Sequence, residues 1–181
     1  TEMGISELHR GLTKFGLGTI TGVDVPGEKG GLIPSEKWKR QTRNQPWYPG
    51  ETVITGIGQG FMLATPLQLA SATAILATRG KVTIPHLLKH IVREGECVPV
   101  QKDLYAGEPL VFEDSENWDQ IIQSMIDVMH GPRGTARSSG KDSKVVLAGK
   151  TGTAQVFQLP QGSDAEEMII PEHLRDHALF V

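Results

Sequence analysis

The sequence has little of what marks several common classes of protein. Its one cysteine, Cys97, excludes an internal disulfide. Lys and Arg are scattered among a slight excess of Asp and Glu, with a net charge of −3, so the clustered basic face of a nucleic-acid-binding protein is lacking. The most apolar stretch, residues 61–78, is interrupted by Pro66 and Gln68, and it falls short of the roughly 20 apolar residues that a membrane-spanning helix needs.

The remaining composition is that of an ordinary globular chain, with 38% hydrophobic and 22% charged residues over 181 positions. This length suits one domain or a large piece of one. We expect a piece truncated at both ends. The chain begins at Thr1 without a methionine, and it ends in the apolar run 178–181, which has strand character but no closing turn.

Four helices are predicted. Apolar residues recur at helical spacing over residues 8–15, after a cap at Ser6-Glu7, and a short helix begins within residues 34–38.

The two longer helices have clearer ends. One lies between Thr65 as its cap and Gly80, with Pro at its first position and Arg in its last turn, and it is apolar or small on nearly every face, which predicts burial. The other begins at Asp114 or Ser115 and ends at His130.

Strands and loops are expected over residues 82–92 and 98–111, and strands over residues 145–148 and 178–181. Residues 133–144 read as a polar, Gly/Ser-rich link. The order of helices and strands, with little alternation, favours an α+β domain over a doubly wound sheet.

Residues 148–155, AGKTGTAQ, combine a lysine with hydroxyls and glycines, a mixture that suits an anionic ligand. A phosphate-binding loop would need a glycine at the position of Lys144 and a helix after Lys150-Thr151. Residues 152–157 instead favour an extended strand. A phosphate-binding loop is therefore rejected.

The other reading of this stretch is the carboxylate-binding strand of an acyl-transfer enzyme. Alternate side chains of a strand point to opposite faces. Lys150 and Thr151 would then stand on two sides of the ligand, and Gly152, without a Cβ, would let a substrate peptide lie against the backbone. An ammonium beside hydroxyls binds a carboxylate through charge-assisted hydrogen bonds, and the Thr153 N–H is placed to supply half of an oxyanion hole. Taken alone, the Lys-Thr-Gly tripeptide fits a solvated surface strand better than a site.

Five longer segments resemble one family, and they occur in the family's order. They are FGLGTITGVDVPGEKGGLIPS, PWYPGETVITGIGQGFMLATPLQLASATAILATRG, MHGPRGTAR, AGKTGTAQVF and LRDHALFV. Lys-Thr-Gly is the third of three motifs in penicillin-binding proteins and serine β-lactamases. The chain is similar to the class B penicillin-binding protein 2 family of elongation-specific D,D-transpeptidases. The resemblance implies an α+β penicillin-binding transpeptidase or serine β-lactamase-like fold, with an antiparallel sheet between helical layers. Residues 1–181 would form the C-terminal portion of a single transpeptidase domain.

The resemblance also implies roles for individual residues. Lys150 and Thr151 would help bind the terminal carboxylate of a D-Ala-D-Ala stem peptide or of a β-lactam antibiotic. Gly152 would leave room for the ligand. Thr153 would give its N–H to the oxyanion hole and its hydroxyl to the carboxylate, and Gln155 would line the rim.

The family's nucleophile is the serine of a Ser-x-x-Lys motif, which precedes the matched region, so we expect the nucleophile to lie outside this sequence. Two stretches imitate the missing motifs. Ser138-x-x-Lys141 lies in the polar link rather than at the start of a buried helix, and Ser115-x-Asn117 lies at a helix cap. We expect neither to be catalytic.

Two histidines, His173 and His177, stand four residues apart, a spacing that can bind a metal on a helix. The residues after His177 look like a strand, so we expect a solvated loop there, with no metal and no cofactor.

The function implied by the resemblance is peptidoglycan cross-linking through a serine acyl-enzyme during cell elongation and shape maintenance, with β-lactams as inhibitors. Two alternatives are a non-catalytic, receptor-like penicillin-binding domain and a serine β-lactamase relative. The resemblance further implies a periplasmic domain of a protein anchored in the inner membrane. Its partner would be the polymerase that makes glycan strands, and no nucleic acid is expected.

Overall fold

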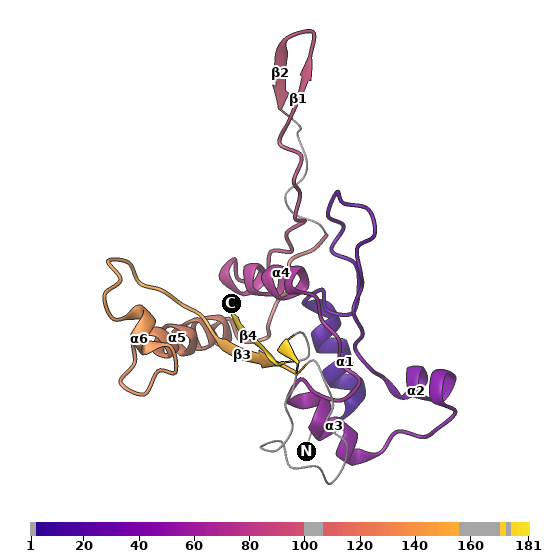
Figure 1. Ribbon diagram of the computed structural model, residues 1–181. Coiled ribbons are helices and arrows are strands. Elements are labelled where there is room, and N and C mark those ends of the chain that lie inside the picture. The colour runs from indigo at the N-terminus through magenta and orange to yellow at the C-terminus, as the bar shows by residue number, and fades with distance from the viewer. Residues whose placement is uncertain (1–2, 100–106, 156–170, 173–174) are drawn as a thin grey trace. The chain divides into compact units, whose positions relative to one another are not determined.

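The computed structural model describes residues 3–99, 107–155, 171–172 and 175–181, and the chain divides into two units, residues 1–118 and 119–181. The elements, drawn in Figure 1, are α1 (Ile5–Lys14), α2 (Glu36–Arg43), α3 (Pro49–Gly56), α4 (Pro66–Ala77), β1 (His90–Arg93), β2 (Glu96–Pro99), α5 (Glu116–His130), α6 (Arg137–Gly140), β3 (Thr151–Ala154) and β4 (His177–Phe180). The described strands form two antiparallel pairs, β1 with β2 and β3 with β4. Helices and small antiparallel sheets agree with the predicted α+β class.

Helix α1 begins earlier than predicted. Its N-cap is Gly4, which makes no side-chain cap bond, so the expected cap at Ser6-Glu7 is wrong. Burial explains the earlier start, because Ile5 is only 3% exposed and packs into the core as the first helical residue. Glu7 now lies within the first turn, where its negative charge favours the positive end of the helix dipole.

The predicted starts of α2 and α4 are confirmed. The hydroxyl of Ser35 accepts the N–H of Trp38 at 3.1 Å and so caps α2. At α4, Thr65 and Gln68 bond reciprocally, side chain to backbone, at 3.1 and 2.9 Å. This capping box satisfies two N–H groups that the helix itself leaves without partners.

The end and the burial of α4 differ from the prediction. The helix ends at Ala77, and Arg79 and Gly80 lie beyond it with φ values of 53° and 101°. Arg79 is therefore outside the last turn. The helix is half-buried rather than buried throughout, with Gln68 and Ile75 as its two buried residues.

Gln68 ties α4 to two loops far away in the sequence. Its side chain is completely buried, and its amide nitrogen donates to the carbonyls of Thr19 at 2.6 Å and Gly30 at 2.7 Å. Its amide oxygen accepts the N–H of Thr65. A buried amide is tolerated only when its polar atoms are bonded, so this side chain fixes the loops on the helix.

The apolar core of the first unit includes an aromatic cluster. The rings of Phe112 and Trp118 stack with centroids 4.1 Å apart, and Phe15 meets Trp118 edge-on at 6.3 Å. Trp118 is only 5% exposed. The N–H of Leu110 donates to the carbonyl of Gly80 at 2.8 Å, which holds the segment after α4 beside this cluster.

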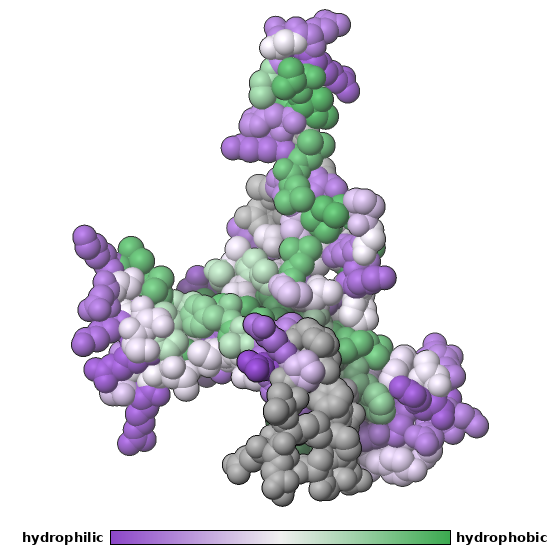
Figure 2. Space-filling view, in the orientation of Figure 1, coloured by the Kyte–Doolittle hydropathy of each residue, from purple (hydrophilic) through white to green (hydrophobic). Residues whose placement is uncertain are grey.

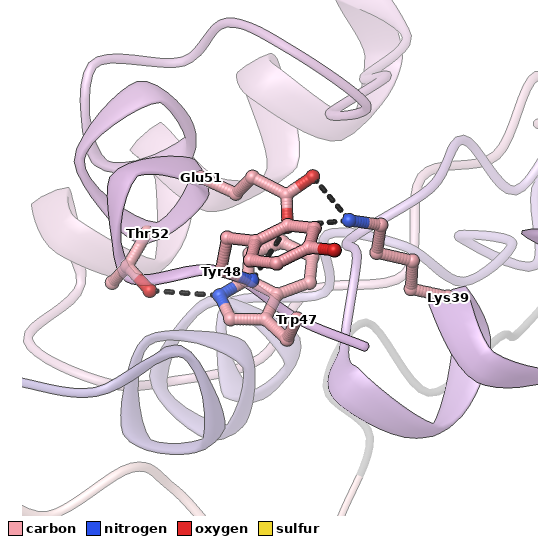
Figure 3. A network of polar contacts seen from close by, with 5 residues as sticks. All are labelled: Lys39, Trp47, Tyr48, Glu51 and Thr52. Atoms are coloured by element: carbon pink, nitrogen blue, oxygen red, sulfur yellow. Dashed lines mark hydrogen bonds and ion pairs between the residues drawn. The ribbon is translucent and has the colours of Figure 1, made fainter. Parts of the chain in front are cut away.

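An ion pair links α2 with α3 (Figure 3). Lys39 is 2% exposed, and its ammonium bonds both carboxylate oxygens of Glu51. The ring of Tyr48 lies 4.5 Å from that ammonium, and the Tyr48 N–H donates to Glu51 at 2.8 Å. The indole N–H of Trp47 donates to the hydroxyl of Thr52 at 2.9 Å. Burial would raise the pKa of Glu51, but the hydrogen bonds from Lys39 and Tyr48 outweigh it, so the pKa lies below its usual value.

The expected strand-and-loop region after α4 contains a hairpin. Strand β1 pairs with β2 over four residues, with Val92 opposite Cys97. Hydrophobic side chains lie on the surface of this hairpin, as the green areas over β1 and β2 in Figure 2 show, and Val92 is 71% exposed. At its base, the carboxylate of Asp24 accepts the N–H groups of Leu87 and Leu88 at 2.7 and 3.1 Å.

In the second unit, the start of the predicted Gly/Ser-rich link folds back on α5. The N–H of Ala136 donates to the carbonyl of Val128 at 3.1 Å, and residues 137–140 form the short helix α6. Gly140 is buried, and a Cβ on it would lie only 2.5 Å from the carbonyl oxygen of Met129. A link throughout residues 133–144 is therefore wrong, because small residues let α6 pack on the end of α5.

The predicted strand at residues 145–148 is also wrong. The ladder lies further along, where Thr151 pairs with Phe180 and Ala154 with His177. The apolar residues at 145–148 carry strand propensity, but strand pairing is set by the partner rather than by propensity. The predicted strand near residues 178–181 is confirmed as β4, shifted by one residue.

Candidate carboxylate-binding site

The backbone of Lys150 is fixed by the continuation of the β3–β4 ladder. Its N–H donates to the carbonyl of Val181 at 2.8 Å, and the Val181 N–H returns a bond of 3.1 Å to the Lys150 carbonyl. Lys150 therefore sits in register immediately before Thr151, the first residue of β3. The lysine projects from a constrained backbone, which reduces the entropy lost when it meets a ligand.

Helix α5 holds the segment that leads into this strand. The N–H of Leu147 donates to Nε2 of His130 at 2.9 Å, and the N–H of Gly149 donates to the carbonyl of Met125 at 3.1 Å. The two donors are two residues apart, so they lie on one side of an extended segment. The end of α5 thus sets the position of the residue before Lys150.

Gly149 is a structural requirement that the sequence pattern did not reveal. It is buried, and a Cβ on it would overlap the ring of Phe180 and come within 2.7 Å of the Val181 carbonyl oxygen. The close approach of β4 needs a residue without a side chain here. The only sequence signal is the glycine itself, because Phe180 lies 31 positions further along the chain.

Gly152 is different. It is exposed, and a Cβ on it would find only the Cβ of Leu179, at an ordinary contact distance of 3.9 Å. Internal packing therefore does not explain a glycine at this position. The space beside its backbone is open, and the predicted ligand there stays a prediction.

Side chains around Thr151 gather one ammonium and two hydroxyls. Nζ of Lys150 donates to the Thr151 carbonyl at 2.7 Å and lies 3.4 Å from the Thr151 hydroxyl. That hydroxyl lies 3.1 Å from the hydroxyl of Thr135, in the turn before α6. Such a set is suited to an anion with two oxygens, because it offers a charge and directed O–H donors.

The other two predicted site residues follow along the strand. Thr153 is exposed, lies on the same face of β3 as Thr151, and pairs with Ala178. Gln155 comes directly after β3 and is exposed. The structure thus places Lys150, Thr151 and Thr153 in one short stretch, and their binding roles stay predictions.

The two stretches that imitate the family's other motifs lie at the ends of helices α5 and α6. Ser138 is exposed on α6, and Lys141 follows that helix. Ser115 directly precedes α5, where its carbonyl accepts the N–H of Trp118. Ser115 therefore lies at the start of a helix, as predicted.

The possible metal ligands His173 and His177 are described only in part. His177 is the first residue of β4 rather than part of the expected loop before it, and His173 lies outside the described residues. Within the described ranges, no group of three or more His, Cys, Asp or Glu side chains is arranged to hold a metal ion. Among the helices of the described parts, none has the length and apolar character needed to cross a membrane.

Comparison with known proteins shows the family to which the chain belongs. The penicillin binding protein transpeptidase domain matches residues 1–170. Peptidoglycan D,D-transpeptidase MrdA of Haemophilus influenzae is 38% identical over 183 residues, which cover 98% of this chain and 27% of the relative.

Solved structures of proteins from peptidoglycan synthesis are also similar to this chain. Pseudomonas aeruginosa PBP2, in complex with WCK 5153, is 46% identical, with a TM-score of 0.80 over 99% of this chain and 36% of that one. A chain of a peptidoglycan synthase complex, described for its coordination of polymerization and crosslinking, is 38% identical with a TM-score of 0.66, over 83% of this chain and 23% of that one.

The fold is therefore the α+β fold of penicillin-binding transpeptidase domains. The chain belongs to the penicillin-binding protein transpeptidase family. It spans little more than a quarter of the length of the curated relatives it matches.

Proposed function

We propose that this chain is the C-terminal portion of the transpeptidase domain of a peptidoglycan D,D-transpeptidase that acts in cell elongation and is acylated by β-lactam antibiotics. In this proposal the chain supplies the wall of the cleft that binds the substrate carboxylate. The nucleophilic serine belongs to a part of the polypeptide outside this sequence.

The observation that carries the proposal is the arrangement at the start of β3. Lys150, Thr151 and Thr153 offer a charge and two hydroxyls along one strand, and the exposed Gly152 between them has no packing role. A free C-terminal carboxylate needs such donors, and the peptide that carries it needs the open backbone beside Gly152.

In this proposal the reaction is acyl transfer through a serine ester. The serine oxygen attacks the carbonyl carbon between the two terminal D-alanines, and the N–H of Thr153 stabilises the resulting oxyanion. The intermediate collapses to an acyl-enzyme and releases D-alanine, which takes up a proton. An amine of a second stem peptide then attacks the ester, which regenerates the serine and forms the cross-link. Lys150 and Thr151 hold the carboxylate of the donor while the bond breaks, and Gln155 lines the rim.

The cellular setting is part of the proposal. The domain would face the periplasm from the inner membrane, where its stem-peptide substrates lie. Its partner would be the polymerase of the elongation machinery, and this rests on the likeness to a chain of a synthase complex that couples polymerization with crosslinking.

The test is covalent labelling of the full-length protein by a fluorescent penicillin, together with release of D-alanine from a pentapeptide donor and formation of a cross-linked product when an acceptor amine is present. A long-lived adduct and a cross-linked product are expected. An intact, folded protein that takes no label would refute the enzyme, and it would favour a receptor-like domain. Rapid loss of the label with hydrolysed penicillin would indicate a β-lactamase relative.

A further inference from the structure

The hydroxyl of Thr135 contacts the hydroxyl of Thr151 at 3.1 Å, although the two residues are 16 positions apart. Thr135 lies in the turn between α5 and α6, and this turn is fixed from both sides. The N–H of Gly134 donates to the carbonyl of Gly131 at 3.0 Å, and the neighbouring Ala136 bonds to α5. Thr135 therefore reaches β3 from a supported backbone.

A threonine hydroxyl has one proton to donate and can accept two bonds. If the Thr151 proton points to Thr135, it is not available for a hydrogen bond to a ligand. If Thr135 donates instead, the Thr151 oxygen is satisfied as an acceptor and its own proton is free for a carboxylate. Nζ of Lys150 also donates to this oxygen at 3.4 Å, so its proton is left to point to Thr135 or to a ligand. An ionised carboxylate can only accept hydrogen bonds, so a bound carboxylate favours the second arrangement, in which Thr135 donates.

We propose that Thr135 is a positioning residue, which donates to Thr151 and thereby turns the Thr151 hydroxyl toward the ligand carboxylate. The inference deepens the proposed function and rests on it. Thr135 does not touch the ligand in this arrangement. It adjusts the strength with which the Lys150–Thr151 pair selects a carboxylate over an uncharged group.

The test compares two probes on the full-length protein: a fluorescent β-lactam with a free carboxylate, and the methyl ester of the same β-lactam. The second-order acylation rate constant is measured for each, and their ratio reports carboxylate selectivity. Thr135→Val removes the hydroxyl and keeps the shape, Thr135→Ser keeps the hydroxyl, and Ser138→Ala is the matched control on the exposed surface of α6.

In Thr135→Val, the carboxylate-to-ester ratio is expected to fall about fivefold, the effect of one hydrogen bond. Thr135→Ser and Ser138→Ala should stay within about twofold of the wild-type ratio. Partial unfolding of a variant lowers both rates equally and leaves the ratio unchanged, so the comparison remains valid for a weakened variant.

An unchanged ratio in Thr135→Val would overturn the inference, and so would a Thr135→Ser variant as impaired as Thr135→Val. Either result leaves the transpeptidase proposal standing, because the wild-type protein is still labelled. If the wild-type protein reacts with neither probe, the proposed function itself fails and this inference fails with it.

Discussion

The ammonium of Lys39 lies 2.5 Å from one carboxylate oxygen of Glu51 and 2.7 Å from the other, and Lys39 is only 2% exposed. The pair joins α2 to α3 across a 12-residue separation. A charge this deep is tolerated only with a partner, since removal of one member leaves the other with the cost of burial but without the attraction.

Lys39→Met should therefore destabilise the protein. Glu51 remains 22% exposed and keeps some contact with water, so the expected loss in unfolding free energy is about 2 kcal/mol, below the range for a fully buried pair. Chemical denaturation followed by tryptophan fluorescence measures it. Lys37→Met, at an exposed position of the same helix, is the control. Equal midpoints for the two variants would contradict this account.

The same pair predicts a dependence of stability on pH. The pKa of Glu51 is lower in the folded protein than its usual value of 4.5, so the unfolded chain binds a proton at a higher pH than the folded chain does. The stability from Glu51 is fully present above the usual value and is lost as the pH falls through the folded value. Glu51→Gln should show a shallower loss of stability below about pH 5 in denaturation midpoints measured across pH. Parallel curves for variant and wild type would argue against a role for Glu51.

Gly149 and Gly152 should respond differently to the same substitution. Gly149→Ala forces a Cβ against Phe180 and the Val181 carbonyl, so it should lower the unfolding free energy by about 2 kcal/mol. Gly152→Ala meets only an ordinary contact and should change stability by less than about 0.5 kcal/mol. It should nevertheless slow labelling by a fluorescent penicillin, because the added methyl group occupies the space proposed for the ligand. Thermal melts and labelling rates on both variants separate the two effects. A Gly152→Ala variant with normal labelling would remove this glycine from the site.

Lys150→Ala should slow acylation without loss of folding. A charge-assisted hydrogen bond to the carboxylate contributes enough that the rate should fall about 10- to 100-fold. Lys144→Ala, an exposed lysine in the segment before the strand, is the control and should react at the wild-type rate. Acylation at an unchanged rate in Lys150→Ala would exclude this lysine from carboxylate binding.

Features set by neighbouring residues could be predicted from the sequence. The starts of α2 and α4 depend on Ser35 and Thr65, whose hydroxyls bond N–H groups three residues away. The start of α1 could not be predicted in this way, because it coincides with the buried residue Ile5 rather than with a side-chain cap. Local capping chemistry is readable in a sequence, whereas burial depends on the whole fold.

In the candidate site, too, adjacent residues can be predicted from the sequence and contacts between distant residues cannot. Lys150, Thr151, Gly152 and Thr153 can be proposed from the sequence because they are adjacent and contain a known motif. The supporting residues were missed. Gly149 is required by Phe180, and Thr135 meets Thr151 through the turn after α5. No periodicity or spacing in a single sequence predicts contacts of this range.

The buried amide of Gln68 is satisfied only when two loops have the correct length. It bonds carbonyls 49 and 38 residues earlier in the chain, and both must arrive at once for its nitrogen to be satisfied. An insertion between Thr19 and Gly30 that shifted one of them would leave a buried donor without an acceptor, whereas an apolar side chain would tolerate such a shift. The glutamine therefore disfavours arrangements in which the Thr19 or the Gly30 carbonyl is displaced, and it fixes the spacing of these two segments relative to α4.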